Sequence, residues 1–491
     1  VGYHNDEITK EPLAVAELGQ FDLDVDDAAR AAIDFLLLDS HVGTTEWFAD
    51  NMRPMSHRVP EGEAIPLHNA VWQDDGCLRA ILDFDRYDIT IDEFRLRTSF
   101  DEGSFTRVSP APDDPDNGPT FGQLSRGGNI FVIDQIDWEN ETVSLDGVHA
   151  PDGRYSLQSY PNGNSGEHYY GSDTRYILTE SITDFTAEKV HSRLELGHGQ
   201  HALRWLDPES PTVPPVTPMS EEQSSRYERL LEALEVGDGH TLQESQIDTI
   251  LEGLSTRVNL VHGPPGTGKT TTTAFAILLR LVDHLEPGDT VLMSGNTHRS
   301  VDNLLDRIAE VEDEFRDIAE RLGFDVPELT LVKVDSEGPG GRVIETGTNG
   351  NIRELDRYRG GGVLLIGGTV SGVLKQMRTL DGSATFGGDS REFYADELTV
   401  DEASMLVFPH FLALSTTVAR DGRILLAGDH RQLSPIVAHD WEEEDRPPVE
   451  LYQPYSSAFE AVHDLADHDD IGSDSIRLSR LEYTFRLPPV I

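Results

Sequence analysis

The chain has 491 residues, enough for two to four domains, and its 89 acidic and 39 basic residues give a net charge of −50. No run of about 18 apolar residues occurs, which excludes a helical membrane span, and no signal peptide is visible at the start as given. A single cysteine, Cys77, excludes a disulfide within the chain and a cysteine-based zinc or iron–sulfur site. We therefore expect a cytoplasmic protein with no membrane partner.

The acidic residues are spread along the whole chain, and the basic residues are almost all arginine. Only five lysines occur: Lys10, Lys189, Lys269, Lys333 and Lys375. Such a composition is typical of proteins adapted to molar salt, as in haloarchaea, because at about 1 M salt the Debye length falls to roughly 3 Å and self-repulsion is tolerated. An acidic disordered tail is the alternative, but the even spread argues against it. The charge therefore indicates a halophilic habitat more than a partner.

Residues 1–206 contain no recognisable catalytic pattern. The apolar spacing of residues 25–38 predicts a helix. Later stretches alternate apolar and polar residues at least in part, which predicts strands and favours a small β-barrel. The expected strands are residues 80–84, 89–96, 130–136, 142–145 (paired with the preceding strand as a hairpin), 176–178 and 201–205.

A proline-rich segment, residues 207–222, follows and predicts a linker or a strap along the surface. Residues 220–234 then have helical spacing and open with the capping-box pattern Ser-Glu-Glu-Gln.

From residue 242 onward, strand-like runs alternate with helical patterns. This alternation predicts an α/β fold, a mainly parallel sheet with helices on both faces, and ligands at the carboxyl ends of the strands. The expected strands are residues 259–261, 290–293, 329–334, 363–366, 398–400 and 424–427.

The central feature of this region is residues 263–270, which fit the phosphate-binding loop pattern G-x-x-x-x-G-K-[ST] between a short buried strand and a helix. The free N–H groups at the start of the helix would meet phosphate charge. Lys269 would reach the β- and γ-phosphates, and Thr270 would give its hydroxyl to Mg²⁺. The residues expected to bind ATP here are Gly263, Pro264, Pro265, Gly266, Thr267, Gly268, Lys269, Thr270 and Thr271.

Two further polar groups follow strand-like runs. Asp401 can hold the same Mg²⁺ as Thr270, and Glu402 beside it can orient and deprotonate a water molecule. Gln432, in Gly-Asp-His-Arg-Gln-Leu-Ser-Pro, can bond the γ-phosphate and report its loss. Alone, each of these patterns is also compatible with an ordinary polar turn.

Together, these stretches resemble the motifs of a superfamily 1 helicase. The forms Asp-Glu-Ala-Ser and Val-Asp-Asn-Leu-Leu are similar to those of the 5′-to-3′ branch, which contains the nonsense-mediated-decay RNA helicase and the Dna2-type DNA helicases. The resemblance covers residues 240–491. Its motifs are residues 242–246 (Q motif), 263–270 (I), 294–305 (Ia), 367–373 (Ic), 401–404 (II), 428–435 (III) and 481–487 (IV).

The resemblance implies further site residues. Gln246 would contact the adenine edge, Phe485 would stack on adenine in place of the usual tyrosine, and Arg486 would neutralise γ-phosphate charge. Single-stranded DNA or RNA would contact four polar residues at strand ends: Asn296, Thr297, Thr369 and Ser371. Such contacts need few lysines, since backbone groups, hydroxyls and stacking can hold a single strand. Each of these four residues could instead simply cap a helix.

The implied organisation is a β-rich accessory domain ahead of a RecA-like ATPase domain. Residues 1–206 would be the accessory domain, helical and then a barrel of the type called 1B on a helical stalk to which residues 220–236 could belong. Residues 207–222 would be the linker and residues 223–480 the ATPase domain. Residues 481–491 would begin a truncated second motor domain. We also expect the sequence, which starts at Val1, to be a fragment that lacks full motor activity.

The function that these features favour is an ATP-dependent helicase or translocase that hydrolyses ATP with Mg²⁺ on single-stranded nucleic acid. The alternative is a nucleotide-gated clamp or scaffold subunit that binds nucleic acid without unwinding it. A P-loop kinase is disfavoured because Gln246 and Gln432 would have no role in it.

Overall fold

The computed structural model divides the chain into two compact units, residues 1–20 with 40–184 and residues 21–39 with 185–491. Helix α2 (Ala28–Asn51) contributes residues to both units. In the part of the chain that the structure describes, no helix combines the length and the apolar character that a membrane crossing requires. The described residues are 28–73, 77–121, 124, 129–147, 156–158, 167–170, 174–181, 185–197, 201–208, 211–235, 240–334, 340–346, 352–377, 394–432, 434–443, 447–467 and 475–483.

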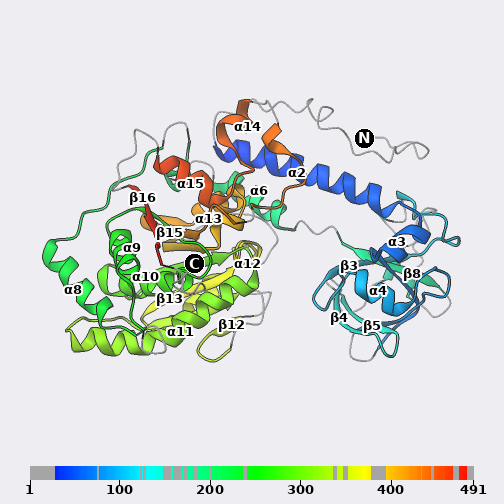
Figure 1. Cartoon of the computed structure of the whole chain (residues 1–491), viewed down its shortest axis with the longest axis horizontal. Helices are drawn as coiled ribbons and strands as arrows, with labels where there is room; N and C mark the ends of the chain where they lie inside the picture. The colour runs from blue at the N-terminus through cyan, green and yellow to red at the C-terminus, as the bar shows by residue number, and fades with distance from the viewer. Residues whose placement is uncertain are drawn as a thin grey trace, which may run out of the picture. The chain divides into compact units, whose positions relative to one another are not determined.

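The first unit contains a closed antiparallel β-barrel with the strand order β1-β2-β5-β4-β3-β8 (Figure 1). Along β5, alternate residues face the inside: Val143 and Leu145 are buried, whereas Asp146 is exposed. The predicted barrel is confirmed, as is the hairpin of β4 and β5. The strands are β1 (Ala64–Trp72), β2 (Leu78–Leu82), β3 (Phe105–Pro110), β4 (Asn129–Asp137), β5 (Thr142–Gly147) and β8 (Arg175–Glu180), with a separate pair β6 (Ser156–Gln158) and β7 (Glu167–Tyr169).

Two predicted strands are wrong. Residues 89–96 contain helix α4 (Ile91–Arg97), because Thr90 and Glu93 form a capping box that starts a helix, and Phe94 then joins the barrel core fully buried. Residues 201–205 are helix α7 (His201–Trp205), and its buried residues Ala202, Leu203 and Trp205 have helical spacing. The barrel unit also contains helix α3 (Met55–Glu61), whereas α7 belongs to the second unit.

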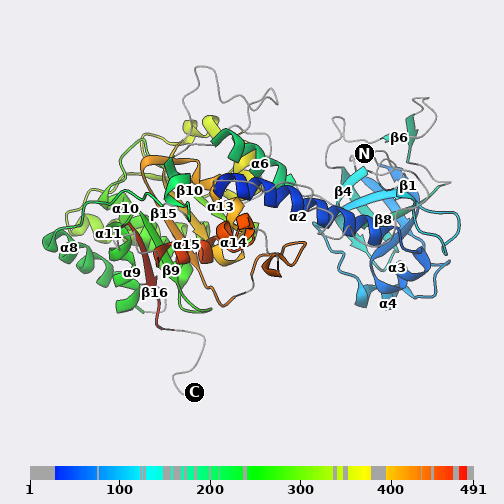
Figure 2. The ribbon, with the colours of Figure 1, turned by 90° about the horizontal axis from the view of Figure 1, so that it is seen from above.

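The second unit is built on an eight-stranded sheet in the order β12-β11-β13-β10-β14-β15-β9-β16, and every strand pair is parallel. Figure 2 shows β16 and β9 beside β15. All six predicted strands are present, and β12 and β16 are added at the two edges. The strands are β9 (Val258–His262), β10 (Thr290–Gly295), β11 (Leu329–Val334), β12 (Ile344–Thr346), β13 (Val363–Thr369), β14 (Ala395–Asp401), β15 (Val418–Gly428) and β16 (Ile476–Arg480).

Helices cover both faces of this sheet, as predicted for an α/β fold. Figure 1 shows α10 and α11 on one side and α6, α13 and α15 on the other. Helix α8 begins at the predicted cap, Ser220, and its apolar face packs into the core of α9–α11, so it belongs to this unit. The helices are α6 (Phe185–Gly197), α8 (Glu221–Glu232), α9 (Glu244–Leu254), α10 (Lys269–Asp283), α11 (His298–Arg321), α12 (Val370–Gln376), α13 (Phe408–Ser415), α14 (Pro447–Tyr452) and α15 (Ala458–Ala466), with short 3-10 turns at Ile352–Tyr358, Ala403–Met405 and Trp441–Glu443.

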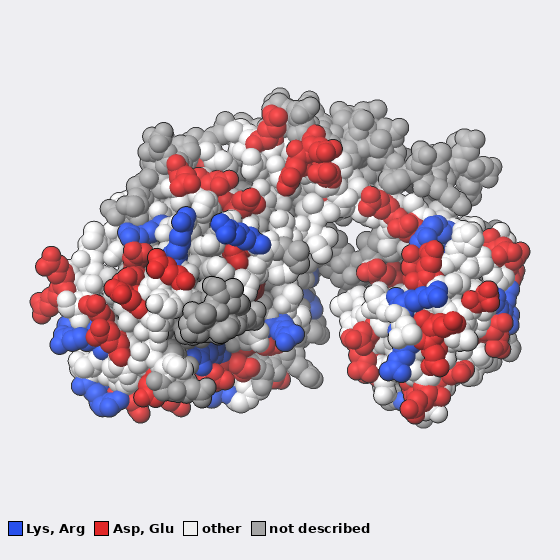
Figure 3. All heavy atoms as spheres, viewed as in Figure 1, with Lys and Arg blue, Asp and Glu red and all other residues white. Residues whose placement is uncertain are grey.

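The proline-rich segment is a strap held to the sheet of the second unit. The carbonyl of Pro214 accepts from Nε of Arg257 at 3.3 Å, and that of Val213 accepts from the hydroxyl of Ser475 at 3.2 Å. On the visible surface, the acidic residues are not concentrated in one segment of the chain. Asp and Glu side chains are spread over both units in Figure 3.

Candidate nucleotide-binding site

The phosphate-binding loop connects β9 to α10, as predicted. Gly266 and Gly268 have φ angles of +82° and +81°, which favour glycine, and Gly268 is the N-cap of α10. Nζ of Lys269 donates to the carbonyl of Gly263 at 2.8 Å, so the buried ammonium is held within the loop. A Cβ on Gly263 would lie 2.4 Å from Oγ1 of Thr267, so this position also requires glycine. The loop is thus a preformed cradle with a lysine at its centre.

Asp401 and Glu402 lie at the carboxyl end of β14, two strands away from β9. Asp401 is 3% exposed, and its Oδ1 accepts from the N–H of Glu402 at 3.0 Å. Burial, followed by the negative charge of Glu402, raises the pKa of the Asp401 carboxyl to about 7, and Lys269 is close enough to oppose this shift. Bound Mg²⁺ would favour the ionised form of this carboxylate.

Glu402 adopts a strained backbone conformation. Its φ and ψ are +52° and +41°, a left-handed geometry that is uncommon outside glycine, asparagine and aspartate. Its Oε2 is buried, and within the described structure that oxygen has no hydrogen-bond partner. Strain and an unsatisfied buried acceptor in one residue are typical of a functional site, where a ligand or water completes the hydrogen bonding.

The oxygen donors of this edge fit a Mg²⁺ ion. Thr270, at the start of α10, supplies a half-buried hydroxyl, and Asp401 supplies a buried carboxylate. Hard cations such as Mg²⁺ prefer such ligands and keep several water molecules.

The segment after β15 lies directly beside the phosphate-binding loop. Gly428 pairs with His262 in the parallel ladder, and its carbonyl accepts from the N–H of Gly263 at 3.2 Å. Asp429 then bonds through its N–H to the hydroxyl of Ser404 at 3.4 Å. Gln432, half-buried in this segment, donates its N–H to the carbonyl of Asp429 at 2.9 Å. The polar groups from three neighbouring strands therefore converge at one edge of the sheet.

Gln246 is buried on α9 against the phosphate-binding loop. Its Nε2 donates to the hydroxyl of Thr272 at 3.1 Å and to the carbonyl of Thr267 at 3.4 Å, and its Oε1 accepts from the N–H of Gln243 at 3.0 Å. Its amide is thus bonded to the chain on both sides, next to the loop that would hold phosphate. Contact with adenine, as the resemblance implies, stays a prediction.

The four residues predicted to contact nucleic acid lie at the carboxyl ends of β10 and β13, where Gly295 pairs with Thr369. Thr297 caps α11 by accepting from the N–H of Ser300 at 3.2 Å, and Thr369 caps α12 by accepting from the N–H of Gly372 at 3.2 Å. The open alternative, helix capping, therefore holds for both threonines.

The other two residues predicted to contact nucleic acid, Ser371 and Asn296, have different surroundings. The hydroxyl of Ser371 accepts a hydrogen bond from Nζ of Lys189 on α6. Asn296 is exposed in the turn before α11. Two predicted residues of the nucleotide site, Phe485 and Arg486, lie outside the described residues.

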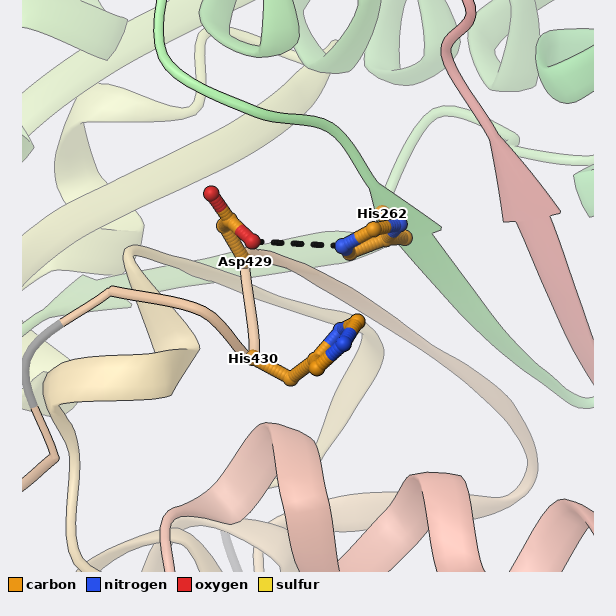
Figure 4. Close-up of side chains that lie close together, drawn as sticks. All are labelled: His262, Asp429 and His430. Carbon is orange, nitrogen blue, oxygen red and sulfur yellow. Dashed lines mark hydrogen bonds and ion pairs between the residues drawn. The ribbon is translucent and has the colours of Figure 1, made fainter.

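Sequence reasoning overlooked residues that join the motifs to one another. Ser404 connects the turn after β14 to Asp429. His262, the last residue of β9, lies with its Nε2 3.2 Å from Oδ1 of Asp429, and the ring of His430 is stacked near it (Figure 4). Only the register of strands distant in sequence brings these groups together, although a histidine directly before a phosphate-binding loop was a visible signal.

This phosphate-binding loop, on a parallel sheet with acidic and amide groups at the same edge, defines a helicase-like P-loop NTPase. Residues 246–438 match the AAA domain family. The chain is 27% identical over 215 residues to regulator of nonsense transcripts 1 from Dictyostelium discoideum, and 26% identical over 223 residues to DNA polymerase alpha-associated DNA helicase A from Schizosaccharomyces pombe. Each match covers 40% of this chain but only 15% and 31% of those relatives. Residues 246–438 therefore carry an AAA domain, and the chain has distant sequence similarity to these two relatives, in agreement with the predicted resemblance.

Two solved helicase structures also align with part of the chain. The UvsW helicase from bacteriophage T4 is 13% identical, with a TM-score of 0.31, over 54% of this chain and 69% of that chain. The helicase nonstructural protein 10 of an arterivirus, solved with DNA, is 16% identical, with a TM-score of 0.20, over 43% of this chain and 37% of that chain.

Proposed function

We propose that the protein hydrolyses ATP to move along single-stranded DNA or RNA, as a helicase or translocase. The observation that carries the proposal is the convergence of Lys269, Asp401, Glu402 and the Gln432 segment at the carboxyl edge of neighbouring strands β14, β15 and β9. Phosphoryl transfer is catalysed mainly by positioning and by charge stabilisation, and this edge supplies both.

Each residue has a distinct part in ATP hydrolysis. Lys269 would exchange the carbonyl of Gly263 for the β- and γ-phosphates. Glu402 would use its unpaired buried Oε2 to orient the attacking water and to accept its proton. Thr270 and Asp401 would hold Mg²⁺, which neutralises phosphate charge when it is bound. Gln432 would bond the γ-phosphate and register its departure.

The adenine end of the site would be formed by α9 and by the segment after β16. Gln246, already bonded to Thr267 of the phosphate-binding loop, is placed to couple base recognition to the loop. Phe485 and Arg486 would stack on the base and stabilise the transition state, respectively.

The nucleic-acid track would run over the ends of β10 and β13. Asn296, exposed in the turn before α11, and the positive N-terminal end of that helix are the groups best suited to a phosphate. Because Thr297 and Thr369 already cap helices, we propose that they contribute mainly by fixing those N-termini. A track that relies on backbone groups and hydroxyls suits an acidic surface and the high-salt habitat that we also propose.

The competing function is a clamp that closes on nucleic acid when ATP binds, without unwinding it. It uses the same nucleotide site, so only the coupling of turnover to a strand separates it from a motor. The strained, unsatisfied Glu402 favours hydrolysis, because a clamp that only binds ATP has no use for a buried general base.

The deciding experiment measures ATP turnover by the purified protein in about 2–3 M KCl, a range chosen for an acidic surface. Turnover is measured alone, with single-stranded DNA and with single-stranded RNA, beside Glu402→Gln. Stimulation by one strand type, lost in Glu402→Gln, is the expected result and identifies the track. ATP binding without strand-stimulated turnover would overturn the motor and support the clamp.

A further inference from the structure

Three side chains beside the phosphate-binding loop form a second polar cluster that ATP hydrolysis does not use. His262 ends β9, and Asp429 and His430 directly follow β15. One donor atom from each lies within 4.8 Å of the other two, and in the described part of the chain no other such trio of histidine, cysteine or acidic residues occurs. Figure 4 shows the ring of His430 close to the ring of His262, which is bonded to the carboxylate of Asp429.

We propose that His262, Asp429 and His430 bind a first-row transition-metal ion of the zinc type. Two imidazoles and one carboxylate suit Zn²⁺, Co²⁺ or Ni²⁺, whereas Mg²⁺ prefers a set made only of oxygens. Three protein ligands also leave a fourth position for water, as in open zinc sites.

The distance between two of the three proposed ligand atoms matches such a site closely. Nε2 of His262 and Oδ1 of Asp429 are 3.2 Å apart, and neighbouring nitrogen and oxygen ligands of a tetrahedral zinc ion lie about 3.3 Å apart. The ring centroids of His262 and His430 are 4.6 Å apart. Because His430 is exposed, its side chain can rotate to close the third position without disturbing a core.

The sheet holds two of the ligands rigidly. His262 pairs with Gly428 across the parallel ladder, so the register of β9 and β15 sets the position of Asp429. Two further hydrogen bonds hold Asp429. Its N–H donates to the hydroxyl of Ser404, and its Oδ1 accepts from the N–H of Arg431 at 3.0 Å. Supporting bonds of this kind orient the ligands of metal sites.

The metal would join the phosphate-binding loop to the segment that carries Gln432. His262 directly precedes Gly263 of the phosphate-binding loop, and Asp429 and His430 begin the segment that carries Gln432. A bound ion would therefore limit movement between the loop and Gln432. This proposal does not rest on ATP hydrolysis, since metal binding is measured without nucleotide.

The simpler alternative is that His262 and Asp429 form only a hydrogen bond. To distinguish the two, the protein is titrated calorimetrically with ZnCl₂ in about 2 M KCl with excess Mg²⁺, so that unspecific binding to the acidic surface is suppressed. Co²⁺ is added in parallel, and its visible spectrum reports a tetrahedral site with imidazole ligands. Thermal unfolding is followed with and without Zn²⁺, because an ion that binds only the folded state raises Tm.

We expect one equivalent of Zn²⁺ to bind, a tetrahedral Co²⁺ spectrum and a higher Tm. His430→Asn, at an exposed position, should keep the fold and weaken binding by at least about 10- to 100-fold, and His262→Gln should do the same. The matched control is His463→Asn, whose ring centroid lies 6.1 Å from that of His430 but which lies outside the cluster.

Equal Zn²⁺ binding by wild type and His430→Asn would overturn the site, as would a loss of binding in His463→Asn alone. An octahedral Co²⁺ spectrum with several weak equivalents would show only adsorption to surface carboxylates. A failed ATPase experiment would leave these results unchanged, so the two proposals fail separately.

Discussion

Strand β14 carries two buried carboxylates, Glu397 and Asp401, that differ in the charges around them. Oε1 of Glu397 accepts from Nε of Arg280 at 3.0 Å and from Nε2 of His284 at 2.8 Å. Burial raises the pKa of Glu397, but these two cations outweigh it and hold the pKa below its usual range. At the end of the same strand, Asp401 has Glu402 beside it, and its pKa rises to about 7.

The difference distinguishes a structural carboxylate from one available to a ligand. A buried charge that is compensated by neighbouring cations stabilises a fold only when those partners are present. Uncompensated buried charge costs stability and is retained where binding or catalysis needs it. A substitution at the Asp401–Glu402 end of β14 should therefore lower ATP turnover and leave stability unchanged. A substitution of Glu397 should lower the free energy of unfolding.

The largest expected effect is the loss of ATP turnover on substitution of Glu402. Glu402→Gln should lower ATP turnover by about 10²- to 10⁴-fold, because a general base contributes that much to proton transfer. ATP binding and Tm should stay close to wild type, since Glu402 has a buried oxygen without a partner. Steady-state turnover and a fluorescent-nucleotide titration provide the two readouts. A large drop in Tm would instead assign Glu402 to the fold.

Glu397→Gln should have the reverse signature. It leaves Arg280 without its buried anion and should lower the free energy of unfolding by about 3–5 kcal/mol. Urea unfolding in constant KCl measures this. The matched control is Glu310→Gln, which breaks an exposed pair with Arg307 and should cost no more than about 1 kcal/mol. Equal costs for the two substitutions would contradict the comparison.

The sequence was sufficient for the parts of the site that are contiguous or lie at strand ends. The phosphate-binding loop is a local pattern, and Asp401 and Glu402 directly follow a buried run, so both could be placed without coordinates. Contacts that depend on strand register could not, because His262 and Asp429 meet only through the pairing of β9 with β15. The same holds for Arg280 with Glu397, which lie on α10 and β14.

Competition between two local sequence signals explains the strand wrongly predicted at residues 89–96. The alternating pattern of residues 89–96 favoured a strand, but the capping box at Thr90 and Glu93 decided for a helix. The barrel was predictable from β2, β5 and part of β4, whose burial alternates, whereas β1 and β3 do not alternate and were not predicted.

The charge balance at Glu397 also predicts a pH dependence. Burial lowers the pKa of His284, but hydrogen bonds to Asp283 and Glu397 outweigh it, so its folded pKa is raised. A raised folded pKa means that this stabilisation is complete below the ordinary value of about 6.5 and is lost as pH rises through the folded value. Glu397, whose pKa is lowered, loses its contribution only at acid pH below about 4.5.

Wild type should therefore exceed His284→Asn in stability by about 1.5–3 kcal/mol near pH 6, the usual value of a hydrogen bond to a charged group. The difference should shrink steadily toward pH 9. Urea unfolding of both proteins at several pH values, in constant KCl, tests this. A difference that is the same at pH 6 and pH 9 would mean that His284 acts only through packing.

The smallest expected effect concerns Thr297, which stands between the roles of cap and nucleic-acid contact. Thr297→Ala removes the hydroxyl that accepts from the N–H of Ser300 and should cost about 1 kcal/mol of stability, the usual value of an N-cap. Thr297→Ser keeps an oxygen at the cap and should restore stability. If Thr297 acts on the strand only through α11, affinity for single-stranded nucleic acid should recover together with stability in the serine variant. Recovery of stability without recovery of affinity would require the threonine methyl group to contact the strand directly.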